Sequence, residues 1–278
     1  MLRSALIPLD NSSSTEFAVQ QAIAFSNCSN CQLMGLGIID VKDITKPEMT
    51  AAGSDVYKQE RDQALLRHAN KRVEECITSF QEACEQADAP HSTRIAGGDP
   101  YKEVVDEAEC HDLIFVGRNS NFHFETSDDV GETFRQLAQD APRPVVAAPE
   151  AAVPFEENVV VGYDGSNQAA RALQMFSLLL LPQIPKIHII SVDKRKKRAK
   201  RRCRRASQFL ENRGADVKTY PIESDTRPSE ILLAQLEILK PRICILGSYG
   251  RKGLSRFFFG STTRDLLKEC QRSIFVYH

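Results

Sequence analysis

The sequence predicts an α/β fold with two tandem, open, five-stranded, mostly parallel sheets that carry helices on both faces. The chain has 278 residues, which suits two domains of about 140 residues each. Short apolar runs alternate along the chain with segments of helical periodicity. This succession occurs twice, so each half reads as five strands separated by four helices.

The strands expected in the first half lie at 6–9, 32–39, 92–95, 113–117 and 144–148, and most of them are brief apolar runs. The helix expected after the first strand has apolar residues at helical spacing between Phe17 and Phe25. Residues 41–64 include Pro47, Gly53 and many polar side chains, so we expect a surface excursion there before a long helix.

The second half repeats the pattern in a shorter form, with strands expected at 160–163, 186–192, 217–221, 243–246 and 273–277. Proline, alanine and glutamate residues at 149–157 separate the halves, which predicts domains at 1–150 and 156–278. Ligands of open α/β sheets bind at the carboxyl ends of the strands. Asp164, Val192 and Gly247 each mark such an end, so we expect them to line one cleft.

The segment from 243 to 263 predicts a phosphate site. A buried strand stops at Gly247, Gly250 follows, and nine further residues lead to Gly260, Ser261 and Thr262, where the hydroxyls suit a helix N-cap. The glycines let the backbone turn sharply and bring N–H groups close to an anion. The helix N-terminus adds unpaired donors and the positive end of its dipole. Two ordinary loop glycines are the alternative interpretation.

Composition argues against several classes of protein. The net charge of −1 predicts no global attraction to nucleic acid or membrane, and no apolar run approaches the roughly 20 residues that span a bilayer. The N-terminus leads directly into a strand pattern, so we expect no secretory signal. The eight cysteines are interpreted as apolar side chains in a reducing cytoplasm. Cys28 and Cys31 lack a second pair or a histidine partner, so we expect no metal site.

The G-x-x-G-x9-G-[ST] pattern, the strand-ending Asp164 and the pair Val192-Asp193 resemble the universal stress protein family. Both halves carry the resemblance over nearly the whole chain, which is therefore similar to a tandem member. The resemblance implies a Rossmann-like sheet related to adenine nucleotide alpha hydrolases. For the branch with this motif it implies binding of ATP, with Mg²⁺ as a candidate companion.

Family roles carry over to matching positions of the second half. Those implied for the adenine and ribose pocket follow the first two strands: Gly162, Tyr163, Asp164, Ser166 and Val192. Those implied for the phosphate grip follow the fourth strand: Gly247, Gly250, Arg251, Gly260, Ser261 and Thr262. Asp164 would contact ribose and adenine, and Val192 would lie against the adenine ring. Tyr249 stands where the family often has histidine.

The first half departs from this motif. Ser120 replaces a glycine, the spacing is one residue longer, and Glu132 places a carboxylate where a phosphate would lie. Like charges at close range in a partly desolvated pocket cost on the order of several kcal/mol. Asp10, Ser12 and Ile38 still match their counterparts, so we expect this half to keep the fold but to bind ATP poorly or not at all. A bound cation that restores the site, or another ligand in this loop, is the alternative.

Residues 194–205 include ten cations among twelve residues. Ala199, Cys203, Ala206 and Leu210 fall on one helical stripe, so we interpret the run as the solvated side of an amphipathic helix. A contact with RNA, DNA or an acidic protein is the alternative, and the absence of interleaved aromatic residues argues against base stacking.

The last strands of the two halves are short and apolar, and unpaired edges seek a partner. By resemblance, the halves should pair with each other through these strands, and a homodimer is a further option. No G-x-x-x-x-G-K-[ST] loop, nucleophile elbow or identifiable catalytic base occurs. We therefore expect a cytoplasmic protein that binds ATP as a structural or signalling ligand and acts on an unknown protein partner. A slow ATPase and a nucleotide-free scaffold are the alternatives.

Overall fold

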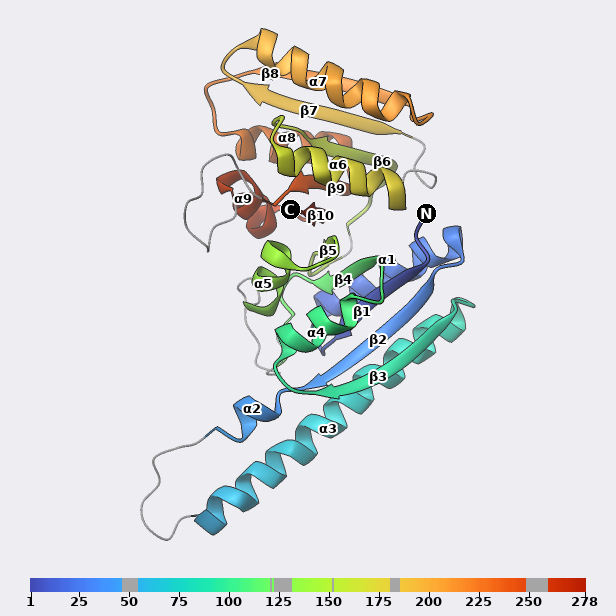
Figure 1. Ribbon diagram of the computed structural model, residues 1–278, viewed down its shortest axis with the longest axis vertical. Helices are drawn as coiled ribbons and strands as arrows, with labels where there is room; N and C mark the ends of the chain where they lie inside the picture. Colours follow the sequence, from blue (N-terminus) through green and yellow to red (C-terminus); the bar gives the residue numbers. More distant parts are fainter. Residues whose placement is uncertain (47–54, 121, 123–131, 152, 181–185, 249–259) are drawn as a thin grey trace.

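The computed structural model describes residues 1–46, 55–120, 122, 132–151, 153–180, 186–248 and 260–278 (Figure 1). The first half consists of β1 (Ser4–Leu9), α1 (Ser13–Ser29), β2 (Gln32–Ile39), α2 (Val41–Ile44), α3 (Asp55–Gln86), β3 (His91–Gly97), α4 (Pro100–Ala108), β4 (Leu113–Gly117), α5 (Glu132–Asp140) and β5 (Val145–Ala148). The second half consists of β6 (Glu156–Gly162), α6 (Asn167–Leu179), β7 (Ile187–Asp193), α7 (Lys196–Glu211), β8 (Val217–Glu223), α8 (Pro228–Leu239), β9 (Pro241–Gly247), α9 (Ser261–Glu269) and β10 (Ser273–Tyr277). All ten predicted strands are present, within a few residues of their expected bounds.

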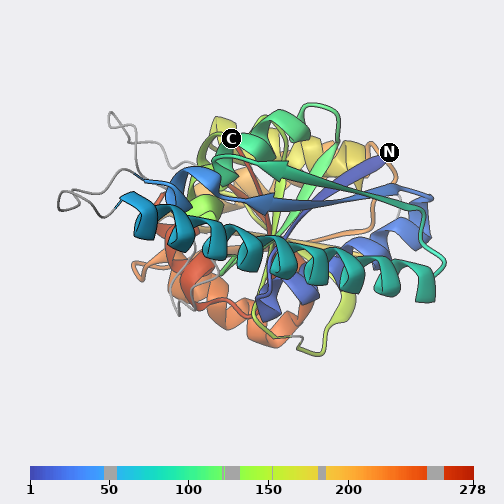
Figure 2. The ribbon, with the colours of Figure 1, turned by 90° about the horizontal axis from the view of Figure 1, so that it is seen from below.

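The long helix of the first half begins earlier than the sequence suggested. We expected an excursion up to residue 64, but α3 is already helical at Asp55. Residues 57–64 are mostly strong helix formers, including Lys58, Glu60 and Ala64, so propensity favours extending the helix toward its N-terminus. Figure 2 shows α3 running alongside the strands at the edge of the sheet, and it packs on β2 and β3.

The strands form one continuous sheet in the order β3-β2-β1-β4-β5-β10-β9-β6-β7-β8. Pairing is parallel within each half, whereas β5 and β10 pair antiparallel and join the halves, as predicted for the last strands. Their register places Phe275 opposite Val146. Each half has the same strand order on its own side of this junction. The hydrogen bonds between β5 and β10 therefore join the two expected sheets into one.

Two layers of helices cover the sheet. One apolar core lies between the sheet and α1, α3, α6 and α7, with Phe115 and Phe275 from the strands. The other lies on the opposite face under α4, α5, α8 and α9, with Val116 and Cys244 from the strands. There are two cores because alternate residues of each buried strand point to opposite faces of the sheet. Both cores run through both halves because the sheet is continuous.

Polar groups also tie the halves together. The buried Arg118 guanidinium donates to the carbonyl oxygens of Cys270 and Arg272, the latter at 2.9 Å. Burial lowers the pKa of Arg118, although the Cys270 thiol and Glu150 act in the opposite direction. The Arg242 guanidinium lies 4.3 Å from the centroid of the Phe25 ring, which is a cation–π contact. In the described ranges, no helix is both long and apolar enough to cross a membrane.

Candidate functional site

Three neighbouring strands of the second half end at one hollow. β6 lies between β7 and β9 and pairs in parallel with both, so the carboxyl ends of all three share an edge. After β6 the chain adds β7 and β8 on one side of this strand, and later β9 and β10 on its other side. The carboxyl end of β6 is therefore the point at which the strand order of this half reverses. A hollow of about 190 Å³ lies there.

Nine of the eleven predicted site residues line this hollow: Gly162, Tyr163, Asp164, Ser166, Val192, Gly247, Gly260, Ser261 and Thr262. Gly250 and Arg251 lie outside the described residues, as do Tyr249 and Lys252. The expected convergence of Asp164, Val192 and Gly247 is therefore found. That these residues contact a nucleotide stays a prediction.

The sequence reasoning missed six lining residues, mostly apolar: Ala169, Ile190, Pro228, Leu232, Leu246 and Thr263. Pro228 and Leu232 come from α8, which packs on β6 and β7. A right-handed crossover after β8 carries this helix back over the sheet. The helical pattern and Pro228 were visible in the sequence, but its position over the hollow follows only from the handedness of that connection.

The glycine at the end of β9 has a different role from the one expected. Gly247 is not among the described residues with positive φ, so it makes no glycine-only turn. A Cβ there would lie 2.5 Å from the Ala169 nitrogen, which no real side chain tolerates. Gly247 thus lets the first turn of α6 approach the strand end. Helix α9 is also tied to the end of this strand, because the Thr263 hydroxyl donates to the Gly247 carbonyl oxygen at 2.9 Å.

Helix α9 presents its N-terminus to the hollow. We expected the hydroxyl residues to cap it, but the N-cap is Gly260, and Ser261 and Thr262 belong to the first helical turn. Gly260 has no side chain, so the cap makes no side-chain hydrogen bond. The first N–H groups of a helix lack partners within it. Uncapped donors and the helix dipole together favour an anion at this end.

The opposite wall begins with an exposed carboxylate. Asp164 Oδ1 accepts a hydrogen bond from the Ser166 N–H at 2.8 Å. Ser166 in turn caps α6, since its hydroxyl accepts from the Ala169 N–H at 3.1 Å. This local network fixes the loop and leaves the second Asp164 oxygen toward solvent, where it can accept from a ligand hydroxyl.

Tyr163 lies between the hollow and a second cavity of about 420 Å³ between α6 and α7. Burial raises the pKa of its phenol, and the Asp164 carboxylate adds to this, against opposing effects of Arg205 and Arg202. The phenol therefore stays neutral at physiological pH and can donate a hydrogen bond.

In the first half, hydroxyl side chains surround the carboxylate that corresponds to Asp164. Asp10, only 5% exposed, accepts from the hydroxyls of Ser12 at 2.6 Å and Thr15 at 2.5 Å. The Thr15 hydroxyl lies 3.0 Å from that of Ser120, which is fully buried. Ile38, the counterpart of the partly exposed Val192, is fully buried too. Gly131 and the side chain of Glu132, on which the expectation partly relied, are outside the described atoms.

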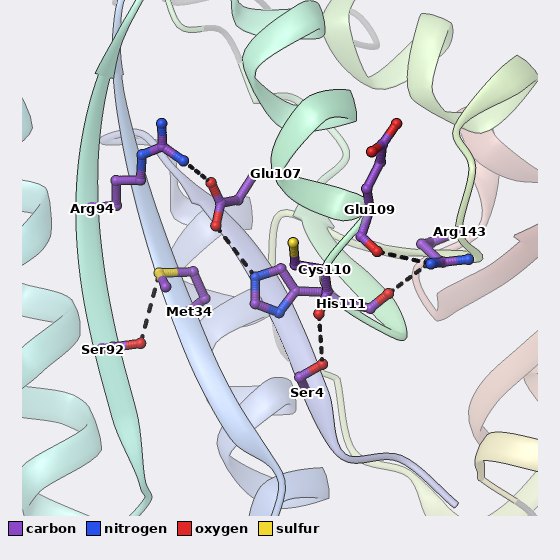
Figure 3. Close-up of polar contacts among 9 residues, drawn as sticks. All are labelled: Ser4, Met34, Ser92, Arg94, Glu107, Glu109, Cys110, His111 and Arg143. Atoms are coloured by element: carbon purple, nitrogen blue, oxygen red, sulfur yellow. Dashed lines mark hydrogen bonds and ion pairs between the residues drawn. The ribbon is translucent and has the colours of Figure 1, made fainter.

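A separate polar cluster at the C-terminal end of α4 has a structural role (Figure 3). Glu107 pairs with Arg94 of β3 and lies 3.6 Å from His111 Nε2. Arg143 donates to the carbonyl oxygens of His111 at 2.7 Å and Glu109 at 2.9 Å. The cluster sits near the amino ends of β4 and β5, at the edge opposite the carboxyl ends of the strands. Among the described residues, no group of three His, Cys, Asp or Glu side chains is placed to hold a metal ion.

Comparison with known proteins gives a consistent result. The model of the universal stress protein family matches residues 1–149. A universal stress protein structure from Archaeoglobus fulgidus DSM 4304 superposes with a TM-score of 0.72 at 21% identity, covering 98% of this chain and 97% of its own. A putative universal stress protein from Pseudomonas aeruginosa UCBPP-PA14 gives a TM-score of 0.57 at 15% identity, covering 99% and 92%. No curated protein matches the sequence significantly.

Proposed function

Because the chain belongs to the universal stress protein family, we propose that its C-terminal half binds an adenine nucleotide, ATP, as a regulatory ligand. The observation that carries the proposal is the hollow at the switch point, where the uncapped N-terminus of α9 faces the exposed Asp164. A triphosphate needs concentrated N–H donors, and a ribose needs a hydroxyl acceptor. The hollow offers both on opposite walls.

The proposed nucleotide lies with its base against Val192 and Leu232, its ribose near Asp164, and its phosphates toward Ser261 and Thr262. The hollow is smaller than the roughly 300–1,000 Å³ of most ligand pockets. Part of the nucleotide therefore extends beyond its walls, past the start of α9. Mg²⁺ would accompany the phosphates there, held by the nucleotide and water.

A regulatory role fits the lining better than rapid turnover. The Tyr163 phenol is neutral at physiological pH, and its surroundings raise its pKa further, while Asp164 already accepts a hydrogen bond from the backbone. Neither group is poised as a strong base for the attacking water. ATP that binds without rapid turnover can change the surface shown to a protein partner.

The first half is proposed to have lost this function and to serve as scaffold. Its hydroxyl network around Asp10 satisfies the carboxylate that would otherwise accept from a ribose. A cytoplasmic location belongs to the same proposal, since all eight cysteines are free.

Isothermal titration of the full chain with ATP and Mg²⁺ tests the proposal. We expect one site per chain, weakened at least tenfold by Asp164→Ala and abolished by Gly260→Glu, which sets a carboxylate against the phosphates. Asp225→Ala removes an exposed carboxylate at the surface, where Asp225 pairs with Lys194, and serves as the matched control. No heat at millimolar ATP would refute nucleotide binding, and release of ADP at about 10 per second would instead indicate an enzyme.

A further inference from the structure

The most concentrated charge in the described chain lies on one outer face of α7. We call this the α7 basic face: every lysine and arginine from 194 to 205 except Arg202, all of them exposed. The opposite side of the helix, with Ala199, Cys203 and Leu210, is buried against β7 and β8. Figure 1 shows α7 at one end of the molecule, with its outer side away from the rest of the chain.

The run makes the charge of the protein strongly uneven. It contributes ten positive charges and no acidic residue, while the whole chain has a net charge of −1, so the remainder carries −11. A polyanion is therefore attracted to this face and repelled by most of the rest. Such a distribution favours docking in one orientation.

The chain itself supplies few counter-charges. Within the described residues, ion pairs of the run are limited to Lys194 with Asp225, and Arg198 and Arg202 with Asp193. Arg198 and Arg202 both pair with Asp193, which precedes the helix, so among the described residues the outer stripe through Lys197 and Arg201 has no ion pair.

The arrangement is also unfavourable for the helix on its own. The Arg195 side chain makes no capping hydrogen bond, and the first turn contains no acidic residue. The carboxylates at this end are those of Asp193 and Glu223, which accept from the Arg195 and Lys196 N–H groups at 3.0 and 3.3 Å. Cations at this end oppose the helix dipole, and like charges spaced four residues apart repel each other. An external polyanion would relieve the repulsion among the outer cations, which these two carboxylates do not reach.

We propose that the α7 basic face binds the phosphodiester backbone of nucleic acid without reading its sequence. Six of the ten cations are arginines, whose planar guanidinium groups suit phosphate oxygens. Neutralising phosphates releases counterions, which drives such binding even without base contacts. The sequence alone favoured a face that is merely solvated, and the unpaired stripe in the folded chain changes that interpretation.

An acidic protein and a membrane fit this face less well. Protein interfaces have an apolar core, but none of the exposed large apolar residues of the described chain lies between 186 and 224. Stable membrane anchoring needs an apolar element beside the cations. The apolar side of α7 is already packed on the sheet and cannot insert.

Fluorescence anisotropy of the full chain with labelled single-stranded RNA and double-stranded DNA of mixed sequence tests the proposal. We expect binding at 50 mM KCl that weakens linearly with the logarithm of salt concentration. The double variant Lys197→Glu/Arg201→Glu should weaken binding at least tenfold and reduce the salt slope by about 1.4 for single strands. Equal binding of RNA and DNA would identify the shared backbone as the ligand, and a preference for one would identify the natural source.

The matched control is Arg67→Glu/Lys71→Glu on α3, which makes the same charge change on an exposed helix of the other half. It should stay within about twofold of the original chain. Equal losses in both variants would overturn the assignment to α7, because net charge alone would then explain them. Binding only to polyglutamate or to anionic phosphatidylserine vesicles would also overturn it. Lys197→Ala/Arg201→Ala repeats the test with the strongest helix former, so that a folding defect cannot imitate the result.

Discussion

Asp10 and Asp164 follow the first strand of their respective halves, yet replacement by alanine should have opposite consequences. Asp10 is buried and accepts hydrogen bonds from the Ser12 N–H, the Ser12 hydroxyl and the Thr15 hydroxyl. Asp164 is exposed and accepts one bond, from the Ser166 N–H. The first carboxylate therefore stabilises its loop, and the second is available to a ligand.

The expected free energies follow from these contacts. A hydrogen bond to a charged group contributes about 1.5–3 kcal/mol, and groups left buried without a partner add to the loss. Because three bonds on one carboxylate are not additive, Asp10→Ala should destabilise the fold by about 3 kcal/mol. Asp164→Ala should cost about 0.5 kcal/mol. For a chain of this size the first value corresponds to a fall of about 6–12 °C in the unfolding midpoint.

Differential scanning calorimetry of both variants measures the difference in thermal stability. Titration with ATP measures the difference in nucleotide affinity. Asp10→Ala should unfold at lower temperature but keep its ATP site, whereas Asp164→Ala should keep its midpoint and lose affinity at least tenfold. Equal thermal losses would show that the two environments do not differ energetically as argued. Loss of ATP binding in Asp10→Ala alone would show that the wrong half was assigned the site.

Two further predictions concern stability. Arg118→Ala should cost about 3 kcal/mol in urea denaturation, because it leaves a gap and two carbonyl oxygens without donors between the halves; an unchanged midpoint would mean that the junction depends on β5 and β10 alone. Burial would raise the pKa of Asp193, but the Arg195 N–H and the guanidinium groups of Arg202 and Arg198 lower it below its ordinary value. Its stabilisation is thus complete above the ordinary aspartate pKa and lost as the pH falls through the lower folded value. Asp193→Asn should flatten the acid side of the midpoint–pH curve between about pH 5 and pH 2, and a parallel curve would contradict this.

Local pattern was enough to predict the strands and the faces of several helices. Buried parallel strands appear as short apolar runs whatever their neighbours are, whereas the more exposed edge strands β3 and β8 were located from the repeated alternation of strands and helices. The stripe Ala199, Cys203, Ala206 and Leu210 is buried as its spacing predicted. The pairing of the two halves through their last strands, β5 and β10, was expected from resemblance and is confirmed, and the structure shows that it is antiparallel.

The site was predicted less completely, because its contacts join residues far apart in the chain. Gly247 was assigned a turn, but its small size serves the approach of α6. The N-cap of α9 is Gly260, one residue before the hydroxyl residues that we expected to cap the helix. The hydroxyl contact between Thr15 and Ser120 depends on two loops meeting across the end of the sheet, which no local pattern encodes.

The sequence by itself determined two α/β halves, the positions of their strands and the residues available for a phosphate motif. These features arise from periodicity and side-chain chemistry, which act over a few neighbouring positions. The tertiary structure decided which residues meet at the hollow of the second half, and which cations of α7 have no counter-charge among the described residues. Both depend on distances between segments that only the packed sheet brings together.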